Sequence, residues 1–517
     1  MSKNKFLKSS LIVMLIIIMG KILAIIRDSL VAAKFGATYT ADIYNFSIGI
    51  VYLLTTISYG LTTTFIPLNT DHIEKYTWEK RNSFVNNIIS TYSIFTIIIT
   101  IILILFSKQI VIIFGSGFSS NIQIFNTSVT VIRIMLVSLI FVSIQSVITG
   151  VLQSHNEFYE PAAMSMVSNI IFIVYLIFFT DSYGIYGFAV ATVIGFFAQF
   201  IINVPKYKKL GYNYKIQFNL RDEELKKMLA LMMPVIISTS LIQLNNFINR
   251  AFAVNIFEGA VTALDLSNKL NTLAYEVFAI GIAMVIYPTL SKYASDNNTK
   301  EYKEALLKGI NVIFLIMIPA SFAIGVLRIP LITILFKRGA FDERAVNLTA
   351  NALLFYSPAM IAYGLRDVLN KAFYAIKDTK TPMINSFLGI IINIIINIFI
   401  VKYMQVSGLT LATSISAIIT TILMLISLNK KLKGIGLKNV FLSFNKILIA
   451  SVSMGGIVFF INEKCLRIFG MNMKGSIISL GTSFIIGSLI YFIIIYFLKV
   501  KEFTYFIDLI REKIKRK

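Results

Sequence analysis

Among the ionisable residues within or beside the long apolar segments of this 517-residue chain, seven are candidates for binding a substrate or an ion: Lys21, Arg27, Asp28, Asp42, Asp265, Lys269 and Glu276. A charged side chain at the centre of a membrane-spanning helix costs about 2.5–3.5 kcal/mol on insertion scales, so such groups usually face a bundle interior or an aqueous cavity. The cations could bind a polyanion such as a diphosphate, and the carboxylates could bind a coupling ion. The pattern indicates ionic recognition inside a membrane.

The first apolar segment carries the densest set of these charges. Lys21 and Asp28 are seven residues apart, which is two helical turns, so they share one helix face. We interpret Lys21, Arg27 and Lys269 as cations that line a cavity. The alternative for Arg27 and Asp28 is a local pair that bends the helix or anchors its packing.

The remaining charges divide into two groups. No nucleotide-binding motif supplies energy, so an ion gradient or the membrane potential would drive the protein. The candidate ion-coupling groups are Asp28, Asp42, Asp265 and Glu276. Structural explanations are open for Arg133, which could hydrogen-bond within its own bundle, for Lys34 at the interface, and for Glu258, Arg366 and Asp367 near segment ends.

The elements that must position these residues are membrane helices. Hydrophobic residues make up 57% of the chain, charged residues 14%, and the mean hydropathy is +0.79, whereas soluble domains carry about 25% charged residues. Apolar segments long enough to cross about 30 Å of hydrocarbon recur throughout. We predict an all-α integral membrane protein with 14 spans, at about residues 9–33, 41–67, 86–107, 127–150, 162–180, 184–203, 229–253, 271–291, 308–328, 347–369, 383–402, 408–428, 444–462 and 475–498.

The sequence also contains a parallel repeat, with an offset of 221 positions inside each half and 223 near its start. The pairs at 221 are Pro67 with Pro288, Pro161 with Pro382, and Gly187 with Gly408; those at 223 are Arg27 with Arg250, Gly36 with Gly259, Ala37 with Ala260, and Asp42 with Asp265. An apolar chain with such a repeat is typical of alternating-access transporters built from two similar bundles.

The repeat and the connections predict the domain organisation. We expect a six-helix bundle at residues 1–203, a basic linker at 204–228, a second six-helix bundle at 229–428, and two extra transmembrane helices with a basic tail at 429–517. Residues 219–227 of the linker could form a short amphipathic surface helix. Lys and Arg collect in alternate connections, so the positive-inside rule predicts a multi-pass membrane protein with both termini cytoplasmic. The abundance of Ile, Lys and Asn favours a bacterial origin, so the expected location is the bacterial plasma membrane.

Composition argues against several other classes. The net charge of +23 reflects Lys and Arg in the connections rather than a surface for nucleic acid. A single cysteine, Cys465, excludes a disulfide framework, and two scattered histidines, His72 and His155, offer no metal constellation. No connection exceeds about 25 residues, which leaves no room for a catalytic domain outside the membrane. We expect neither an enzyme nor a cofactor.

Several segments are similar to a known family. They are residues 27–37, Asp42, residues 65–67, 150–161, 287–291, 336–341, 366–375 and 378–382. In these segments the chain resembles the MurJ (MviN) lipid II flippase family of the multidrug/oligosaccharidyl-lipid/polysaccharide exporter superfamily. The resemblance covers spans 1–12, and two additional C-terminal spans distinguish this family from the twelve-span drug exporters.

The resemblance implies a function in peptidoglycan biosynthesis, cell-wall biogenesis and cell shape. Members move the undecaprenyl-diphosphate-linked precursor lipid II from the inner to the outer leaflet. By the resemblance, Lys21, Arg27, Asp28, Asp42 and Lys269 would bind substrate in a central cationic cavity, and spans 13 and 14 would hold its lipid tail. The implied partners are the lipid-linked oligosaccharide, membrane lipids and the cell-wall synthesis machinery.

Two departures from the family pattern keep alternatives open. No charged residue lies between Asp42 and Pro67, where the family usually has basic residues and a Glu, and Asn268 stands where an Asp commonly precedes the basic residue. Another lipid-linked oligosaccharide, such as an O-antigen or exopolysaccharide precursor, or a drug is therefore an alternative substrate. A second alternative is a membrane glycosyltransferase or polymerase, which would need catalytic carboxylates or a metal site. A third is a paralogue that has lost transport, which would fail to complement bacteria depleted of their flippase.

Overall fold

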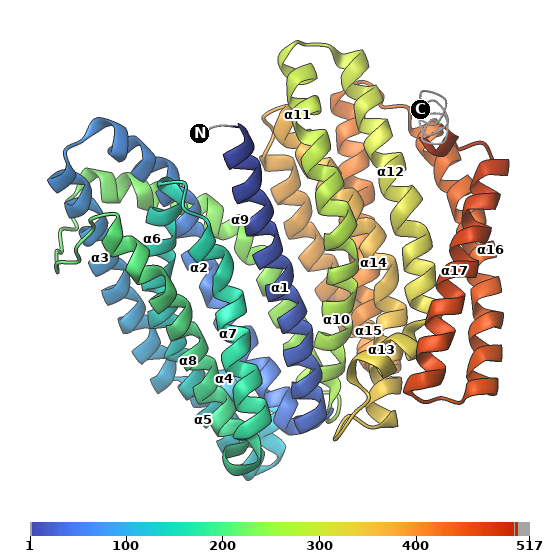
Figure 1. The fold of residues 1–517 in the computed structure, drawn as a ribbon, viewed down its shortest axis with the longest axis horizontal. Coiled ribbons are helices and arrows are strands. Elements are labelled where there is room, and N and C mark those ends of the chain that lie inside the picture. Colours follow the sequence, from blue (N-terminus) through green and yellow to red (C-terminus); the bar gives the residue numbers. More distant parts are fainter. Residues whose placement is uncertain (1–2, 501, 505–517) are drawn as a thin grey trace. The chain divides into compact units, whose positions relative to one another are not determined.

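The described part of the chain, residues 3–500 and 502–504 of a computed structural model, forms helices and no strands (Figure 1). This confirms the predicted all-α fold. The helices gather into two compact units, of which the first reaches Thr262 and includes Arg338–Phe341, and the second contains the other described residues from Ala263 onward. Each unit is described by itself below.

The first unit is built on α2, α3 and α6. Phe65, Ile88 and Val151 of these helices are fully buried in its core. A Cβ atom at Gly150 would lie 2.5 Å from the ring of Phe65, so only glycine lets α6 approach α2 this closely. The helices are α1 Lys3–Phe35, α2 Tyr39–Lys75, α3 Trp78–Leu105, α4 Ser107–Phe114, the 3-10 turn η1 Ser116–Ser120, α5 Ile122–Leu136, α6 Ser138–Ser154, α7 Tyr159–Phe178, α8 Thr180–Lys209 and α9 Glu223–Val254.

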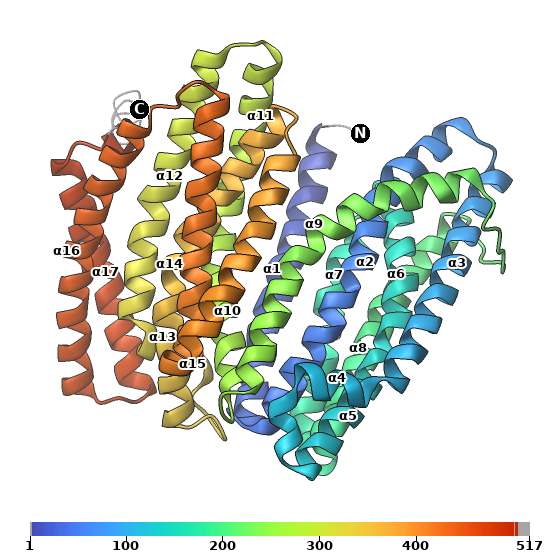
Figure 2. The same cartoon turned by 180° about the vertical axis from the view of Figure 1, so that it is seen from behind.

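The second unit has its core between α12, α14 and α16. These three helices can be followed in Figure 2. Ile313, Val368 and Ile447 are fully buried between them, and the hydroxyl of Tyr302 on α12 donates to the carbonyl oxygen of Ala372 on α14 at 2.6 Å. The elements are α10 Ala260–Tyr275, whose first three residues belong to the first unit, the π-helical turn η2 Glu276–Ile280, α11 Gly281–Ser295, α12 Thr299–Val326, α13 Arg328–Phe336, α14 Glu343–Ala375, α15 Lys380–Lys431, α16 Leu437–Phe469 and α17 Met473–Phe497.

Eleven helices in the described residues are long and apolar enough to cross a membrane, or up to 12 if the bent pair Glu223–Ile237 and Thr239–Val254 is one span. The 52-residue α15 is counted once, although its backbone breaks at Gln405, between the predicted spans 383–402 and 408–428. The apolar run from α10 to α11 is interrupted by η2 and is not counted. The multi-pass character is clear, while the predicted count of 14 stays a prediction.

The predicted repeat has a counterpart in backbone conformation. Gly184 in α8 has φ 52° and ψ −141°, and Gln405 in α15, at the repeat offset of 221, has φ 52° and ψ −131°. Gly36 and Gly259, at the offset of 223, both have positive φ as well. A non-glycine residue rarely adopts positive φ, so the same break at matching positions indicates that both halves follow one chain path.

Helix α9 belongs to the first compact unit, where it packs along α2. The repeat assigns the same residues to the second bundle, at 229–428. The compact units group residues that contact one another in space, whereas the bundles taken from the repeat group residues by sequence duplication, so the two divisions need not coincide. The bundle boundaries taken from the repeat therefore stay a prediction.

The linker between α8 and α9 is not helical. Residues 212–219 have no regular secondary structure. Helix α9 begins at Glu223, capped by the side chain of Asp222, which accepts from the amide of Glu224 at 2.9 Å. The expected amphipathic helix at 219–227 is therefore wrong for residues 219–222. Side chains of α3 hold the backbone of the linker instead, a tertiary interaction that outweighs local helix propensity.

His155 contacts the start of this linker. We expect the stability of the folded protein to depend on pH through this histidine. Its Nε2 atom lies 3.1 Å from the hydroxyl oxygen of Tyr212. Burial lowers the pKa of His155 below its ordinary value, and the charge of Arg81 lowers it further, against the opposing effect of Glu157. Because the unfolded chain then binds the proton more readily, stability is constant above about pH 6.5 and falls as the pH drops through that value.

The measurement is the midpoint of thermal unfolding of the detergent-solubilised protein between about pH 8 and pH 5. Wild type should lose stability towards pH 5, by up to about 1.4 kcal/mol for each unit by which the pKa is lowered. His155→Gln should lose less. Parallel curves for the two proteins would contradict a role for His155.

Glycine is required at Gly259, immediately before α10. Its φ is +89°, and a Cβ atom there would lie 2.4 Å from the carbonyl oxygen of Ala37. We expect Gly259→Ala to destabilise the protein by about 2 kcal/mol or more, since left-handed backbone costs a side-chain-bearing residue 1–2 kcal/mol before the clash is counted. Thermal unfolding measures this. Gly481→Ala in α17, with no atom within 4 Å of the new methyl group, is the matched control and should be neutral or stabilising.

Candidate functional site

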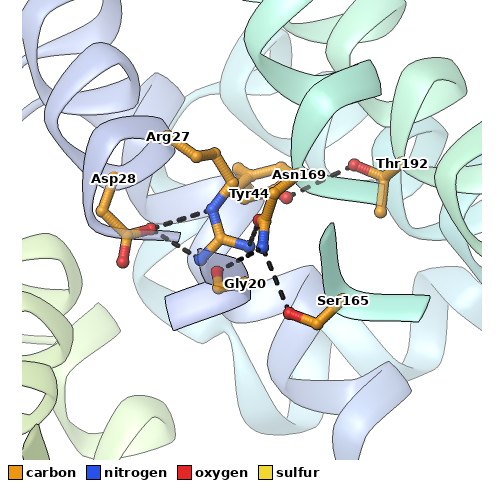
Figure 3. Close-up of polar contacts among 7 residues, drawn as sticks. All are labelled: Gly20, Arg27, Asp28, Tyr44, Ser165, Asn169 and Thr192. Atoms are coloured by element: carbon orange, nitrogen blue, oxygen red, sulfur yellow. Dashed lines mark hydrogen bonds and ion pairs between the residues drawn. The ribbon is translucent and has the colours of Figure 1, made fainter. Parts of the chain in front are cut away.

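Arg27 lies at the centre of a polar network between α1 and α7 (Figure 3). Its Nε and Nη2 atoms donate to Oδ1 of Asp28 at 3.1 and 2.8 Å, and Nη1 donates to Oδ1 of Asn169 at 3.0 Å. The Arg27 side chain is 17% exposed and that of Asp28 is 13% exposed. The local pairing of Arg27 with Asp28 is therefore confirmed, with Asn169 as a third member.

Asn169 orients the guanidinium group. Its amide nitrogen donates to the carbonyl oxygen of Gly20 at 3.3 Å and to the hydroxyl of Ser165 at 3.2 Å, so its carbonyl oxygen must face Arg27. The guanidinium carbon also lies 5.8 Å from the ring centre of Phe172, within range of a cation–π interaction. These contacts fix the orientation of the planar guanidinium group of Arg27.

Five N–H donors belong to an arginine side chain, and the network uses three of those of Arg27. The other two make no hydrogen bond within residues 3–500 and 502–504. A single carboxylate partner leaves the guanidinium able to bind a second anion. Arg27 thus combines rigid support with spare donor capacity, which is what recognition of a phosphate group requires.

Asp42 has a different environment, at the start of α10. It is 1% exposed. Oδ2 accepts from the amide of Gly259 at 2.7 Å, and Oδ1 accepts from both the amide and the hydroxyl of Thr262 at 2.8 and 2.7 Å. In return, Oε1 of Glu258 accepts from the amide of Tyr39 at the start of α2, at 3.0 Å. The two acidic residues cap each other's helices, where carboxylates also favour the positive end of the helix dipole.

These contacts give Asp42 a structural role that its sequence position did not reveal. Its carboxylate oxygens already accept from α10 and the residue before it, whereas the resemblance implies substrate binding for Asp42. Binding and ion coupling through Asp42 both stay predictions. Glu258, which we expected to be structural, does act as a helix cap.

Other charges near the predicted spans also have structural partners. Arg133 donates from Nε to the hydroxyl of Ser107 at 2.7 Å, which confirms a hydrogen bond within its own bundle. Lys34 pairs with Asp181 at 2.8 Å. Arg250, the repeat counterpart of Arg27, is 8% exposed and packs against Gly49, where a Cβ atom would lie 2.8 Å from its Nη1.

Lys21 has the most open position of the first-unit candidates. It lies on an exposed part of α1, six residues before Arg27. Exposure within a membrane span leaves a long basic side chain able to reach an aqueous cavity or the interface. The role of Lys21 as a substrate-binding cation stays a prediction.

Asp265, Lys269 and Glu276 follow one another along α10 and η2 in the second unit, with one helical turn between the first two and two turns between the last two. Asp265 is 5% exposed and stands one helical turn before the half-buried Lys269, so the two share a face of α10. Glu276 opens the π-helical turn η2, a rare element that occurs frequently at functional sites. Sequence analysis had no signal for this turn.

Glu276 also belongs to a wider group of charges. Asp367 on α14 lies within electrostatic range of Arg366, Lys371 and Glu276, and the guanidinium carbon of Arg366 lies 5.4 Å from the ring centre of Tyr363. Sequence analysis treated Arg366 and Asp367 as a structural pair. It did not connect them with Glu276, because the two segments are about 90 residues apart.

A model of the family described as "Lipid II flippase MurJ" matches residues 31–479. The chain belongs to the MurJ family. A protein named "Probable lipid II flippase MurJ" from Buchnera aphidicola subsp. Schizaphis graminum is 28% identical over 516 residues, with 98% of this chain and 99% of the relative covered. A relative with the same name from Rickettsia prowazekii is 27% identical over 506 residues, with 96% and 98% covered.

A "Lipid II flippase MurJ" from Burkholderia cenocepacia is 26% identical over 422 residues, covering 80% of this chain and 82% of the relative. Among solved structures, "Lipid II flippase MurJ, inward closed conformation" matches with a TM-score of 0.80 at 24% identity, over 97% of this chain and 100% of that one. An inward-facing multidrug resistance MATE transporter of the MOP superfamily matches with a TM-score of 0.68 at 14% identity, over 82% and 98%.

The family model confirms the family that the sequence motifs indicated, and the MATE transporter shares its fold with most of this chain. The MurJ fold extends over nearly the whole chain, whereas the MATE likeness leaves 18% of it uncovered. The family resemblance named Arg27 and Asp28 but gave no role to Asn169. A weak signal existed, since an asparagine in the apolar stretch Tyr159–Phe178 needs a buried polar partner.

Proposed function

We propose that this membrane protein is a flippase that moves lipid II, the polyprenyl-diphosphate-linked peptidoglycan precursor, from the inner to the outer leaflet by alternating access. Membership of the MurJ family supports the substrate. The observation that carries the mechanism is the supported guanidinium of Arg27, with spare donors inside a predicted span. The lack of charged residues between Asp42 and Pro67 favours another lipid-linked oligosaccharide, and family membership outweighs it.

The proposed role of Arg27 is to bind a phosphate oxygen of the substrate diphosphate. Asp28 and Asn169 hold the guanidinium plane in place before the substrate arrives, so little side-chain entropy is lost on binding. Asp28 also limits the affinity by partly neutralising the charge. A flippase needs this balance, because a substrate bound too tightly in one state would not be released in the other.

Lys21 and Lys269 are proposed as further cations for the same anionic substrate. Asp265 and Glu276 are proposed as ion-coupling groups, with η2 as the segment whose backbone changes during the transport cycle. Transport of this kind breaks no covalent bond, so the protein would need no catalytic residue. Both termini would lie in the cytoplasm, and the cell-wall synthesis machinery would use the delivered substrate.

The test is reconstitution of the purified protein in vesicles with fluorescently labelled lipid II in both leaflets. A membrane-impermeant quencher reports how fast the labelled lipid exchanges between leaflets. Active protein should accelerate exchange, and unlabelled lipid II should compete while an undecaprenyl-diphosphate-linked O-antigen precursor should not. Equal competition by the two lipids would instead favour a flippase of broader substrate range.

Complementation provides the cellular counterpart. The chain is expressed in bacteria depleted of their own lipid II flippase, and its membrane level is measured. Rescue of growth and cell shape is expected. No rescue by a well-expressed protein, together with no exchange of lipid II in vesicles, would exclude the proposed substrate.

A further inference from the structure

The linker between α8 and α9 has exposed apolar side chains for which the transport function gives no role. We call residues 212–222 the strap. Apolar residues occur at every second position of the strap, the period at which an extended chain turns side chains to one face. Tyr214, Ile216, Phe218 and Leu220 are 50%, 84%, 52% and 55% exposed. Such exposure of alternate large side chains is unusual for a segment held firmly in place.

The strap is held firmly by α3. The side-chain amide of Asn87, itself fully buried, donates to the carbonyl oxygen of Asn219 at 3.0 Å, and its Oδ1 accepts from the amide of Asn219 at 2.8 Å. The side chain of Asn87 thus makes the two hydrogen bonds that the backbone of a paired β-strand would make. Ser90 accepts from the amide of Gln217 at 3.1 Å, and Asn82 and Asn86 each donate to the carbonyl oxygen of Asn213 at 3.2 Å.

The consequence is a fixed orientation. Tyr212 at the start of the strap is buried in the core, and the hydroxyl of Tyr214 lies 3.1 Å from that of Ser90. Beyond them α3 binds the backbone of the strap, and Ile216, Phe218 and Leu220 stay exposed. The strap lies between the ends of α8 at Lys209 and of α9 at Glu223, which are both candidate membrane segments (Figure 1). Its place along the chain is therefore the boundary between hydrocarbon and water.

Exposed cations surround the strap. They are Lys208, Lys209, Lys215, Arg221, Lys226 and Lys227. Three acidic residues follow the strap closely. Asp222 caps α9 and Glu224 lies 3.6 Å from His72, while Glu223 is exposed, so the exposed cations outnumber the exposed acids. Apolar and aromatic side chains flanked by Lys and Arg are the composition of segments that insert into the headgroup region of anionic membranes.

We propose that the strap is a site for anionic lipid headgroups of the cytoplasmic leaflet, with Ile216 and Phe218 inserted among the acyl chains. The excess of exposed cations selects negatively charged lipid over zwitterionic lipid. The site is separate from the Arg27 network and does not depend on which substrate is transported.

The test uses a tryptophan in the strap and vesicles of phosphatidylcholine and phosphatidylglycerol. The chain has one tryptophan, Trp78, so Ile216→Trp is made in a Trp78→Phe background and brominated acyl chains serve as quenchers. We expect quenching by both brominated lipids. At equal mole fraction, brominated phosphatidylglycerol should quench roughly twofold more strongly, and added salt should reduce this preference.

Charge variants identify the source of the preference. In the triple variant Lys208→Gln, Lys209→Gln and Lys215→Gln, the two brominated lipids should quench equally. The matched control Lys292→Gln, Lys300→Gln and Lys308→Gln removes the same charge from another basic segment and should keep the preference. Phe218→Trp in the same background is a second probe, so that poor folding of one variant does not decide the result.

Two outcomes would overturn the proposal. If neither brominated lipid quenches the fluorescence of a tryptophan at position 216 or 218, the strap faces water. Equal quenching by the two lipids at low salt in the otherwise unchanged protein would show contact with the membrane without a site for anionic headgroups.

Discussion

Arg27→Ala should remove lipid II exchange in reconstituted vesicles, with a loss of about 100-fold, and should abolish rescue of bacteria depleted of their lipid II flippase. Truncation of a charged hydrogen-bonding group in a largely desolvated site costs roughly 3 kcal/mol, which corresponds to that factor. The variant removes the donors proposed for the diphosphate. It also removes the ion pair of Arg27 with the Asp28 carboxylate, which is 13% exposed, so the site becomes more negative and less favourable for an anion.

Two controls separate substrate binding from folding. Arg27→Lys keeps the charge but loses the planar group that holds Asp28 and Asn169 together, so it should retain only part of the activity. Arg133→Ala removes another arginine of a predicted span, whose Nε donates to Ser107, and should lower stability more than exchange. Exchange that is unchanged by Arg27→Ala at equal protein level would refute the proposed role.

Asp42→Asn should destabilise the protein by about 3 kcal/mol, although the two side chains have nearly the same shape. Both carboxylate oxygens of Asp42 accept from backbone amides, one from Gly259 and the other from Thr262. An asparagine must place its NH₂ group against one of these N–H groups in either orientation. The NH₂ group of the asparagine would then face a buried backbone N–H group, and neither donor would have an acceptor. The negative charge at the start of α10 is lost as well. Each unsatisfied buried group costs about 1–3 kcal/mol.

Thermal unfolding of the detergent-solubilised protein checks this expectation. Asp181→Asn is the matched control, because Asp181 is 83% exposed and its pairing with Lys34 is a surface ion pair, which contributes about 1 kcal/mol or less. Asp42→Asn that unfolds at the wild-type temperature but no longer exchanges lipid II would assign Asp42 to the substrate or to ion coupling instead of to the cap.

The sequence by itself determined the class of the protein, the repeat and the family. Hydrophobic spans follow from composition, because a helix in hydrocarbon must satisfy its own backbone and cover itself with apolar side chains. The repeat was equally visible, and the matching backbone breaks at Gly184 and Gln405 appear where its offset places them. Arg27 and Asp28 stood out because charges in such segments are rare.

Tertiary structure decided what each charge contacts. Asp42 looked like a site residue because its side chain is acidic and lies in an apolar segment. Its partners Gly259 and Thr262 are more than 200 residues away, and only folding brings them to it. Asn169 could not be joined to Arg27 from sequence for the same reason. The strap is not helical, because side chains of α3 supply the hydrogen bonds of its backbone, an interaction that no local propensity contains.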